Sequence, residues 1–311
     1  MRPPDAAGRT ARHQVLPALA VLLCSAAAAG GSGFPWVMPN AFLIPGAALL
    51  VILAVWALWR RKLLLAGAAV TSVFIAVWPI VEVGSAQKQA ARGDAFITVA
   101  HLNVHEANEA VAAVAAVAKA TGADVLSLQE VDEHWYRALQ GHLASELPYH
   151  FHAPAERNYG IALFSKYPLD PAEVLDLAGL PALRTKVSVE GKALVLISAH
   201  LRAPESASKW QHRNRQWELL AQAVRTAGEP VCLVGDLNTV PWDPAFKQFE
   251  RATGLWHGTH AWRPTWPSLG GISCVPLDHV LTSAACADRE IRSFNIPGSD
   301  HRGLVFKVVL Y

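Results

Sequence analysis

Polar side chains that could hold a cation or move a proton follow several apolar runs of this sequence, at the point where each run ends. The clearest case is Asp236 and Asn238, which come directly after the apolar run 231–234 in the stretch GDLN. A carboxylate and an amide two residues apart could bind a cation or orient a water molecule. Asp and Asn also favour turns, so one such pair is ambiguous by itself.

Matching polar groups stand at the ends of other apolar runs, which weakens the turn explanation. Carboxylates and amides without cysteine partners suit a hard cation such as Mg²⁺ or Mn²⁺. Histidines beside carboxylates suit proton transfer or contact with phosphate. The sequence therefore predicts one polar site assembled from several strand ends. The further candidates are Asn103, Glu130, His200, Asp278, Asp300 and His301.

The elements that must position these residues alternate between short apolar runs and longer amphipathic segments. Apolar runs rich in β-branched residues predict strands, and the Ala-rich segment 106–120, closed by Gly122, predicts a helix. Strands with helices between them favour a layered α/β domain. Strands are expected at 95–104, 123–128, 159–165, 184–189, 193–199, 231–235, 278–282, 289–295 and 304–310, and helices at 106–120, 134–147 and 205–227.

The N-terminal part of the chain differs in composition from this α/β part. Hydrophobic residues make up 52% of the whole chain, and residues 1–84 hold only eight of its charges. Apolar runs at 15–30, 41–59 and 63–83 approach the roughly 20 residues that a membrane-spanning helix needs. They predict three spans, although the first run, which is short and follows a basic start, could instead be a signal peptide.

The positive charges orient these predicted spans. Basic residues precede the first run, and Arg60, Arg61 and Lys62 separate the second run from the third, whereas the loop 31–40 carries no charge. The positive-inside rule places both basic clusters in the cytoplasm. We therefore expect a multi-pass protein of the cytoplasmic (inner) membrane. Its parts would be a membrane region at 1–84, a linker at 85–94 and an extracytoplasmic domain at 95–311.

Six short motifs in this domain resemble those of the endonuclease/exonuclease/phosphatase superfamily. They are LNV, LQEVD, SAHL, GDLNT, LDHVL and GSDHRG, in that order, and the likeness covers residues 96–311. The membrane-anchored layout and the stretch WRPTWPS at 262–268 further resemble bacterial members of the teicoplanin-resistance type. The resemblance implies a four-layered α/β sandwich of the DNase I type, here preceded by three transmembrane helices.

The resemblance also implies a metal site for Mg²⁺ or Mn²⁺. Glu130 would be the main ligand, Asn103 would help to hold the metal and the phosphate, and Asp300 would position the metal. Phosphoryl transfer depends more on charge neutralisation and an aligned water than on a covalent nucleophile, which agrees with this set.

The remaining matched residues would act on the substrate. Asp236 would orient or deprotonate the attacking water, and Asn238 would bind a phosphate oxygen. His200 and His301 would contact phosphate oxygens, with Asp278 orienting His200. An Asp beside a His can fix its tautomer and keep it cationic.

Several neighbouring residues have simpler explanations. His101 and His105 alternate with Asn103, so they share its strand face and could line the site. A position on the protein surface is the simpler explanation. Tyr159 reads as a packing aromatic. Cys274 and Cys286 could form a disulfide in an oxidising compartment, but their spacing does not establish one.

These features predict a membrane-anchored, divalent-metal-dependent phosphoesterase that hydrolyses an extracytoplasmic phosphate ester, with an envelope or lipid-linked phosphate as the favoured substrate. The α/β domain is slightly acidic and lacks a long basic stripe, which disfavours a duplex-binding protein. Two alternatives stay open. One is an extracytoplasmic nuclease, and the other is a non-catalytic membrane protein that binds its ligand without turnover.

Overall fold

The chain divides into two units by its internal contacts. The computed structural model describes residues 6–31, 33–84, 95–228, 230–258, 262–270 and 272–311. One unit comprises Met1–Ser85 with Trp242–Pro244, and the other comprises Ala86–Pro241 with Ala245–Tyr311. The predicted linker at 85–94 lies outside the described residues.

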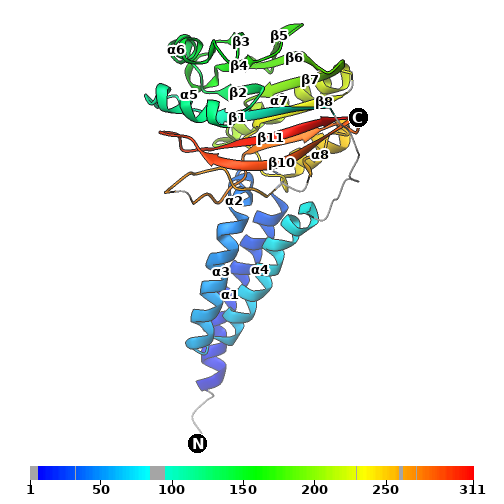
Figure 1. Ribbon diagram of the computed structural model, residues 1–311. Coiled ribbons are helices and arrows are strands. Elements are labelled where there is room, and N and C mark those ends of the chain that lie inside the picture. The colour runs from blue at the N-terminus through cyan, green and yellow to red at the C-terminus, as the bar shows by residue number, and fades with distance from the viewer. Residues whose placement is uncertain (1–5, 32, 85–94, 229, 259–261, 271) are drawn as a thin grey trace, which may run out of the picture. The chain divides into compact units, whose positions relative to one another are not determined.

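The first unit is helical. Its elements are α1 (Ala6–Gly30), the short α2 (Val37–Ala41), α3 (Leu43–Trp59) and α4 (Leu63–Gly84) (Figure 1). Two of the three predicted spans, His13–Gly30 and Leu63–Val83, are long and apolar enough to cross a membrane. The middle helix, α3, has 17 residues. At about 1.5 Å per residue it falls a few ångströms short of a hydrocarbon core about 30 Å thick.

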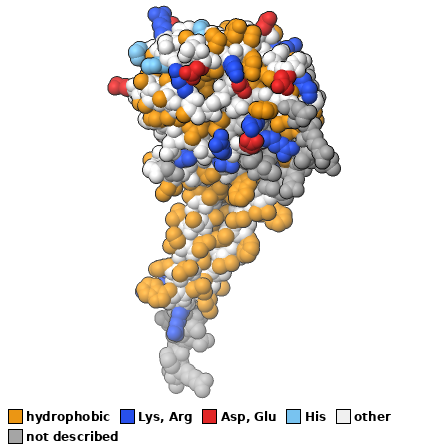
Figure 2. Space-filling view, viewed as in Figure 1, with side chains coloured by type: hydrophobic (Ala, Val, Ile, Leu, Met, Phe, Trp, Pro, Cys, Tyr) orange, Lys and Arg blue, Asp and Glu red, His pale blue; other side chains and the backbone are white. Residues whose placement is uncertain are grey.

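The described side chains of these helices bury small residues and expose large ones. Ala57 and Ala69 are fully buried, whereas Leu16, Phe74 and Trp78 are each more than 70% exposed. On the face drawn in Figure 2, apolar side chains cover much of the described surface of these helices. Close packing through small residues, with large apolar residues outward, is typical of helices surrounded by lipid.

The second unit contains two mixed β-sheets. In the first sheet the strand order is β10-β11-β1-β2-β4-β3, and in the second it is β5-β6-β7-β8-β9. The pairs β1–β2 and β7–β8 are parallel and the other neighbours are antiparallel. The first sheet is built from β1 (Phe96–Asn103), β2 (Val125–Gln129), β3 (Tyr149–Ala153), β4 (Ile161–Ser165), β10 (Cys286–Asn295) and β11 (Arg302–Leu310). The second is built from β5 (Ala172–Asp176), β6 (Pro181–Val189), β7 (Lys192–Ala199), β8 (Val231–Asp236) and β9 (Asp278–Thr282).

Helices cover the outer face of each sheet, which gives four layers (Figure 1). Helices α5 (Val111–Ala120) and α6 (Glu133–Leu143) pack on the first sheet. Helices α7 (Ala207–Thr226) and α8 (Pro244–Thr253) pack on the second. A third apolar core lies between the sheets. This arrangement confirms the predicted α/β sandwich and is consistent with the DNase I type.

Strand alternation explains why polar residues gather at one end of the inter-sheet layer. Val99 of β1 and Val234 of β8 face the core between the sheets. Because side chains two apart share a face, His101 and Asn103 continue the first row, and Asp236 continues the second. The site is thus the polar end of the same side-chain rows that form the apolar core.

One glycine sets the approach of β7 to the strand that carries Asp236. Gly235 has φ +157°, and a Cβ there would lie 1.8 Å from the backbone oxygen of Ala199. We expect Gly235→Ala to lower the free energy of unfolding by more than about 2 kcal/mol, because rigid backbone must move. Urea unfolding of the purified chain measures this.

The matched control for this substitution is Gly141→Ala in α6. A Cβ at Gly141 has no atom within 4 Å, and alanine is the better helix former by up to about 1 kcal/mol. The control should therefore be neutral or stabilising. Equal stability of the two variants would show that the close approach at Gly235 is unimportant.

Candidate active site

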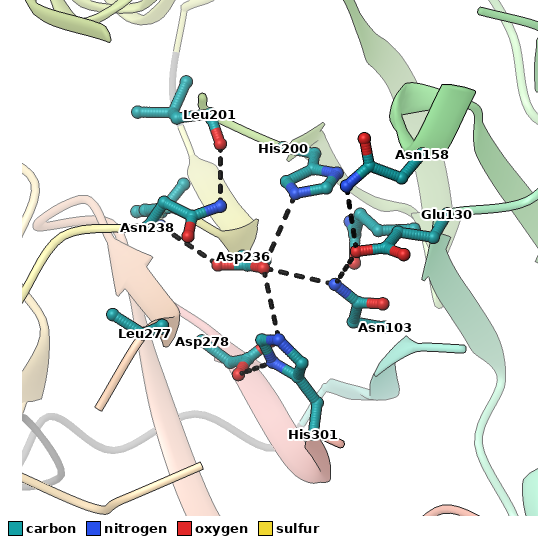
Figure 3. A network of polar contacts seen from close by, with 12 residues as sticks. Asn103, Glu130, Asn158, His200, Leu201, Asp236, Asn238, Leu277, Asp278 and His301 are labelled. Carbon is teal, nitrogen blue, oxygen red and sulfur yellow. Dashed lines mark hydrogen bonds and ion pairs between the residues drawn. The ribbon is translucent and has the colours of Figure 1, made fainter. Parts of the chain in front are cut away.

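Six of the predicted site residues gather around a seventh, Asp236, which lies at the end of β8 (Figure 3). The Asp236 Oδ2 atom accepts a hydrogen bond from Asn103 Nδ2 at 3.2 Å. The same oxygen lies 3.5 Å from His200 Nε2 and 3.7 Å from His301 Nε2. The cluster comprises Asn103, Glu130, His200, Asp236, Asn238, Asp278 and His301.

The environment of Asp236 makes it a better proton acceptor than an ordinary aspartate. The side chain is almost fully buried, and its Oδ1 atom accepts the backbone N–H of Asn238 at 3.0 Å. Burial raises the pKa of Asp236, and the nearby His301 opposes that shift without cancelling it. A carboxylate with a raised pKa inside a polar cluster is suited to general-base chemistry.

Asp278 holds two histidines, and this corrects one prediction. Its Oδ2 atom lies 2.8 Å from His301 Nδ1, and its Oδ1 atom lies 2.6 Å from His101 Nε2. Asp278 therefore orients His301. The prediction that it orients His200 was wrong. The sequence could not show this because the contact joins β9 with the loop before β11, 23 residues away.

The two candidate phosphate-binding histidines differ in charge. Burial disfavours the cation of His301, but Asp278 and Asp236 outweigh burial and raise its pKa to about 10. Burial lowers the pKa of His200, and Asp236 opposes that effect only in part. His301 is therefore cationic at neutral pH, while His200 is neutral.

His101 and Tyr159, which are neighbours of these histidines, do not have the simple roles expected from the sequence. His101 is fully buried, because β1 is covered on both faces, so the expectation of a surface position was wrong. The Tyr159 ring does pack, but it packs on His200, with ring centroids 5.1 Å apart. The Arg202 guanidinium lies 5.2 Å from the centroid of the same tyrosine ring. Tyr159 thus borders the site.

Glu130 lies on the other side of Asn103. It has φ +62° and is 8% exposed. Its Oε1 atom accepts a hydrogen bond from Asn103 Nδ2 at 3.0 Å and lies 3.5 Å from Asn158 Nδ2. Its Oε2 atom accepts the backbone N–H of Glu106 at 2.8 Å. All three donors are neutral, so the carboxylate keeps its capacity to bind a cation.

Asp300 lies beside Trp266 and His105. Its Oδ2 atom accepts a hydrogen bond from the Trp266 indole at 2.9 Å. Its Oδ1 atom lies 3.4 Å from His105 Nδ1, which in turn lies 3.9 Å from Glu130 Oε2. His105 therefore links the two carboxylates that were predicted to hold and position the metal.

Two groups of side chains could hold a divalent cation. Donor atoms of Asp236, Asp278 and His301 lie within 4.8 Å of one another. In that group both Asp278 oxygens already face histidines, and His301 Nδ1 is one of their partners. The carboxylate of Glu130, whose hydrogen-bond donors are all neutral, fits a hard cation better, and the part of Asp300 in positioning that cation stays a prediction. Asn103 turns its nitrogen toward Glu130, so its part as a direct ligand stays a prediction.

Sequence reasoning missed several contacts that shape the site. Trp266 lies in the stretch WRPTWPS, but nothing in that stretch indicated its contact with Asp300, and the contact of Asn158 with Glu130 had no periodic signal. The alternation of His101 with Asn103 did point to a shared face. Cys274 and Cys286, both in the described part of the chain, form no disulfide. The Cys286 thiol instead lies 3.3 Å from the carbonyl oxygen of Val231.

Carboxylate, amide and imidazole groups gathered at the strand ends of a two-sheet sandwich are the groups that metal-dependent phosphoester hydrolysis uses. The profile of the Endonuclease/Exonuclease/phosphatase family matches residues 100–301, and the chain belongs to this family. Its members are metal-dependent phosphoesterases or nucleases, and this chain is an enzyme of that kind. None of the curated proteins searched matches the chain.

Solved structures share the fold at low sequence identity. An endonuclease/exonuclease/phosphatase from Beutenbergia cavernae is 20% identical, with a TM-score of 0.57 over 70% of this chain and 72% of that chain. D. rerio TDP2 complexed with single strand DNA product is 19% identical, with a TM-score of 0.56 over 69% and 99%. Sphingomyelinase C from Streptomyces griseocarneus is 16% identical, with a TM-score of 0.53 over 69% and 99%.

Proposed function

We propose that this chain is a membrane-anchored, divalent-metal-dependent phosphoesterase that hydrolyses an extracytoplasmic, lipid-linked phosphate ester. One observation carries the catalytic part of this proposal. A buried Asp236 with a raised pKa stands between the cationic His301 and the cation-binding side of Glu130. A base, a fixed positive charge and a metal-binding carboxylate are the groups that phosphoester hydrolysis requires.

Each residue has a proposed part in the reaction. A divalent cation, held by Glu130 and positioned by Asp300, supplies charge neutralisation for the phosphate when it is bound. Asp236 orients the attacking water and accepts its proton. His301, kept cationic by Asp278, stabilises the charge that develops on a phosphate oxygen.

The other side of the phosphate would meet neutral donors. His200 donates from its neutral ring. Asn238 donates an amide N–H, and its Nδ2 atom is fixed by a bond to the carbonyl oxygen of Leu201 at 2.8 Å. Neutral and cationic donors on opposite sides of Asp236 would bind one phosphate group between them.

An apolar loop beside the site favours a lipid-linked substrate. Among the described residues of the second unit, the three most exposed large apolar side chains are Trp262, Leu269 and Ile272, at 55%, 68% and 76%. The loop is fastened to the site, because the Ser268 N–H donates to the backbone oxygen of Asp300 at 2.6 Å. Leu269 and Ile272 lie side by side, because the backbone N–H of each donates to the carbonyl oxygen of the other at 3.0 Å. Exposed neighbouring apolar side chains can mark an interaction surface, and a lipid suits such a surface beside a phosphate site.

This loop gives a direct prediction. Replacing Leu269 by Asn together with Ile272 by Ser should lower hydrolysis of phospholipid in vesicles by about tenfold or more. Loss of one buried apolar side chain is worth about 1.5–3 kcal/mol, and about 1.4 kcal/mol is tenfold in rate. Hydrolysis of a small soluble phosphodiester should stay unchanged. The control, Val174→Asn, removes an exposed apolar residue from β5. Equal rates on vesicles for the double variant and the control would refute the role of the loop.

The proposed location is the cytoplasmic membrane, with several spans and the catalytic unit outside the cytoplasm. The outward-facing large apolar residues of α1 and α4 support an anchor in lipid. Whether α3 crosses the membrane decides on which side of it the second unit lies. An odd number of spans places that unit outside the cytoplasm, and an even number places it inside. A periplasmic reporter enzyme fused after Gly84 should be active. An inactive fusion would place the catalytic unit inside.

A nuclease is the second candidate, because D. rerio TDP2, which shares the fold, was solved with a DNA product. The full-length chain should be assayed on extracted envelope lipid phosphates and on single- and double-stranded DNA, with Mg²⁺, with Mn²⁺ and with chelator. Metal-dependent release from lipid that exceeds DNA cleavage supports the proposal. DNA cleavage far above lipid turnover would replace it with the nuclease, and no turnover of any substrate would favour a non-catalytic binding protein.

A further inference from the structure

We infer that Arg202 is a specificity-determining residue, which binds a second anionic group of the substrate beside the phosphate that is cleaved. The inference rests on the phosphate site of the proposed function and narrows its substrate class to phosphoesters that carry two anionic groups. Its starting point is the Arg202 guanidinium, which lies against the Tyr159 ring at the border of the site.

The backbone of Arg202 is fixed to the centre of the site through its neighbour. The Leu201 N–H donates to the backbone oxygen of Asp236 at 3.0 Å, and the Leu201 carbonyl oxygen accepts a hydrogen bond from Asn238 Nδ2 at 2.8 Å (Figure 3). The N–H of Arg202 itself donates to Oε1 of the fully buried Gln216 at 2.8 Å. The Arg202 side chain therefore starts from a fixed point beside the proposed phosphate-binding groups.

The side chain of Arg202 ends at a ring that contacts one of these groups. The guanidinium carbon lies 5.2 Å from the centroid of the Tyr159 ring, and the centroids of the Tyr159 and His200 rings are 5.1 Å apart. One aromatic ring thus separates the guanidinium from the histidine that is proposed to contact the scissile phosphate. A substrate with its phosphate at His200 can therefore bring a second anionic group to Arg202, which is only half-buried.

The charge of Arg202 is not neutralised within the part of the chain that the structure describes. Its guanidinium makes no ion pair there, and its Nε atom is buried without a hydrogen-bond partner. Burial raises the pKa of the Tyr159 hydroxyl, so the adjacent ring is neutral. The nearest acidic residue along the chain, Glu205, pairs instead with Lys209. A half-buried cation without a counter-ion is unfavourable, and an anionic ligand would relieve that cost.

A purely structural role accounts less well for this arrangement. The contact of a guanidinium with a tyrosine ring is weak where the cation is partly exposed. Arg184, which is also half-buried, donates from Nε and Nη2 to the two carboxylate oxygens of Glu173 at 2.8 and 3.0 Å. The fold thus provides a carboxylate for Arg184 and none for Arg202. Because a guanidinium binds phosphate and carboxylate groups through parallel N–H donors, Arg202 suits an anionic ligand.

The test is binding of two small probes to the full-length chain in detergent with Mg²⁺. Glycerol 3-phosphate carries one phosphate, and glycerol 1,3-bisphosphate carries a second one and is otherwise the same. We expect calorimetric titration to show that the bisphosphate binds about tenfold tighter or more, because one hydrogen bond to a charged group corresponds to about that factor. Arg202→Gln should remove this difference without weakening binding of the monophosphate, and Arg202→Lys should retain part of it.

The matched control is Arg215→Gln, which removes an exposed arginine of α7 whose Nη1 atom pairs with Glu218 at 2.6 Å. This variant should keep the whole preference for the bisphosphate. A preference that survives in Arg202→Gln would overturn the inference, and so would an equal loss of both probes in that variant, because it indicates a structural role. If the unsubstituted chain binds neither probe, the phosphate site of the proposed function fails as well. If it binds both probes equally, only this inference fails.

Discussion

Replacing Glu130 by Ala is expected to lower kcat/KM for the chain's phosphoester substrate by about a thousandfold or more. A catalytic cation contributes several kcal/mol of transition-state stabilisation, and about 4 kcal/mol corresponds to about a thousandfold in rate. The fold should persist, because Glu130 accepts hydrogen bonds from neutral donors, Asn103, Asn158 and the Glu106 N–H, at a net worth of about 1 kcal/mol each. Kinetics, metal titration and thermal unfolding of the variant measure these effects together.

The control for Glu130→Ala is Glu133→Ala, three residues further along the chain. Glu133 is exposed, and its Oε1 atom pairs with Arg137 on the surface of α6 at 2.7 Å. Such a pair is worth at most about 1 kcal/mol, so activity should be unchanged. A Glu130→Ala variant that keeps metal-dependent turnover would remove Glu130 from the site. If Glu130→Ala loses turnover while cells that produce it behave like cells with the unsubstituted chain, the non-catalytic function is favoured.

Replacing Asp236 by Asn should give the second largest loss of turnover, because it removes the general base and leaves the metal ligand Glu130 in place. General-base catalysis contributes about 10²–10⁴-fold, and the neutral amide cannot accept the proton of water. The loss should fall on kcat more than on KM. Asn has the size of Asp and can still accept the N–H of Asn238, so the local backbone should be retained. Steady-state kinetics at saturating metal measure the change.

Metal affinity separates the two variants. Asp236→Asn should bind metal almost as the unsubstituted chain does, whereas Glu130→Ala should not. The control Asp176→Asn lies at the exposed end of β5 and should leave both turnover and metal binding intact. If Asp236→Asn loses metal affinity as Glu130→Ala does, then Asp236 is a ligand and the group it forms with Asp278 and His301 holds the ion.

Much of the fold and of the site could be predicted because both follow from one alternating pattern. A residue at the end of an apolar strand continues a row of inward side chains, as Asn103 continues the row of Val99. Asp236 could be found in this way from a short stretch of sequence, whereas Asn238, at φ +45°, lies beyond the end of β8. The same rule does not predict the position of Glu130. Strand β2 ends at Gln129, and Glu130 itself has φ +62°, so the chain changes direction there.

Pairings between the sheets could not be predicted, because they depend on how the two layers face each other. Asp278 meets His101 from 177 positions away, and nothing along the sequence signals that distance. The expected helix 106–120 begins only at Val111 for a local reason. Asn108 bonds through Nδ2 to the carbonyl oxygens of Val104 and Pro297, which holds residues 105–110 in a turn.

The most direct test of the account is a crystal structure of the chain with Mn²⁺ and phosphate, in which anomalous scattering locates the metal. We predict a metal bound to Glu130, with the phosphate within hydrogen-bond distance of His301, His200 and Asn238. An ion held instead by Asp236, Asp278 and His301, or a phosphate bound away from Asp236, would contradict the assignment of base, cation and metal ligand on which the proposed function depends.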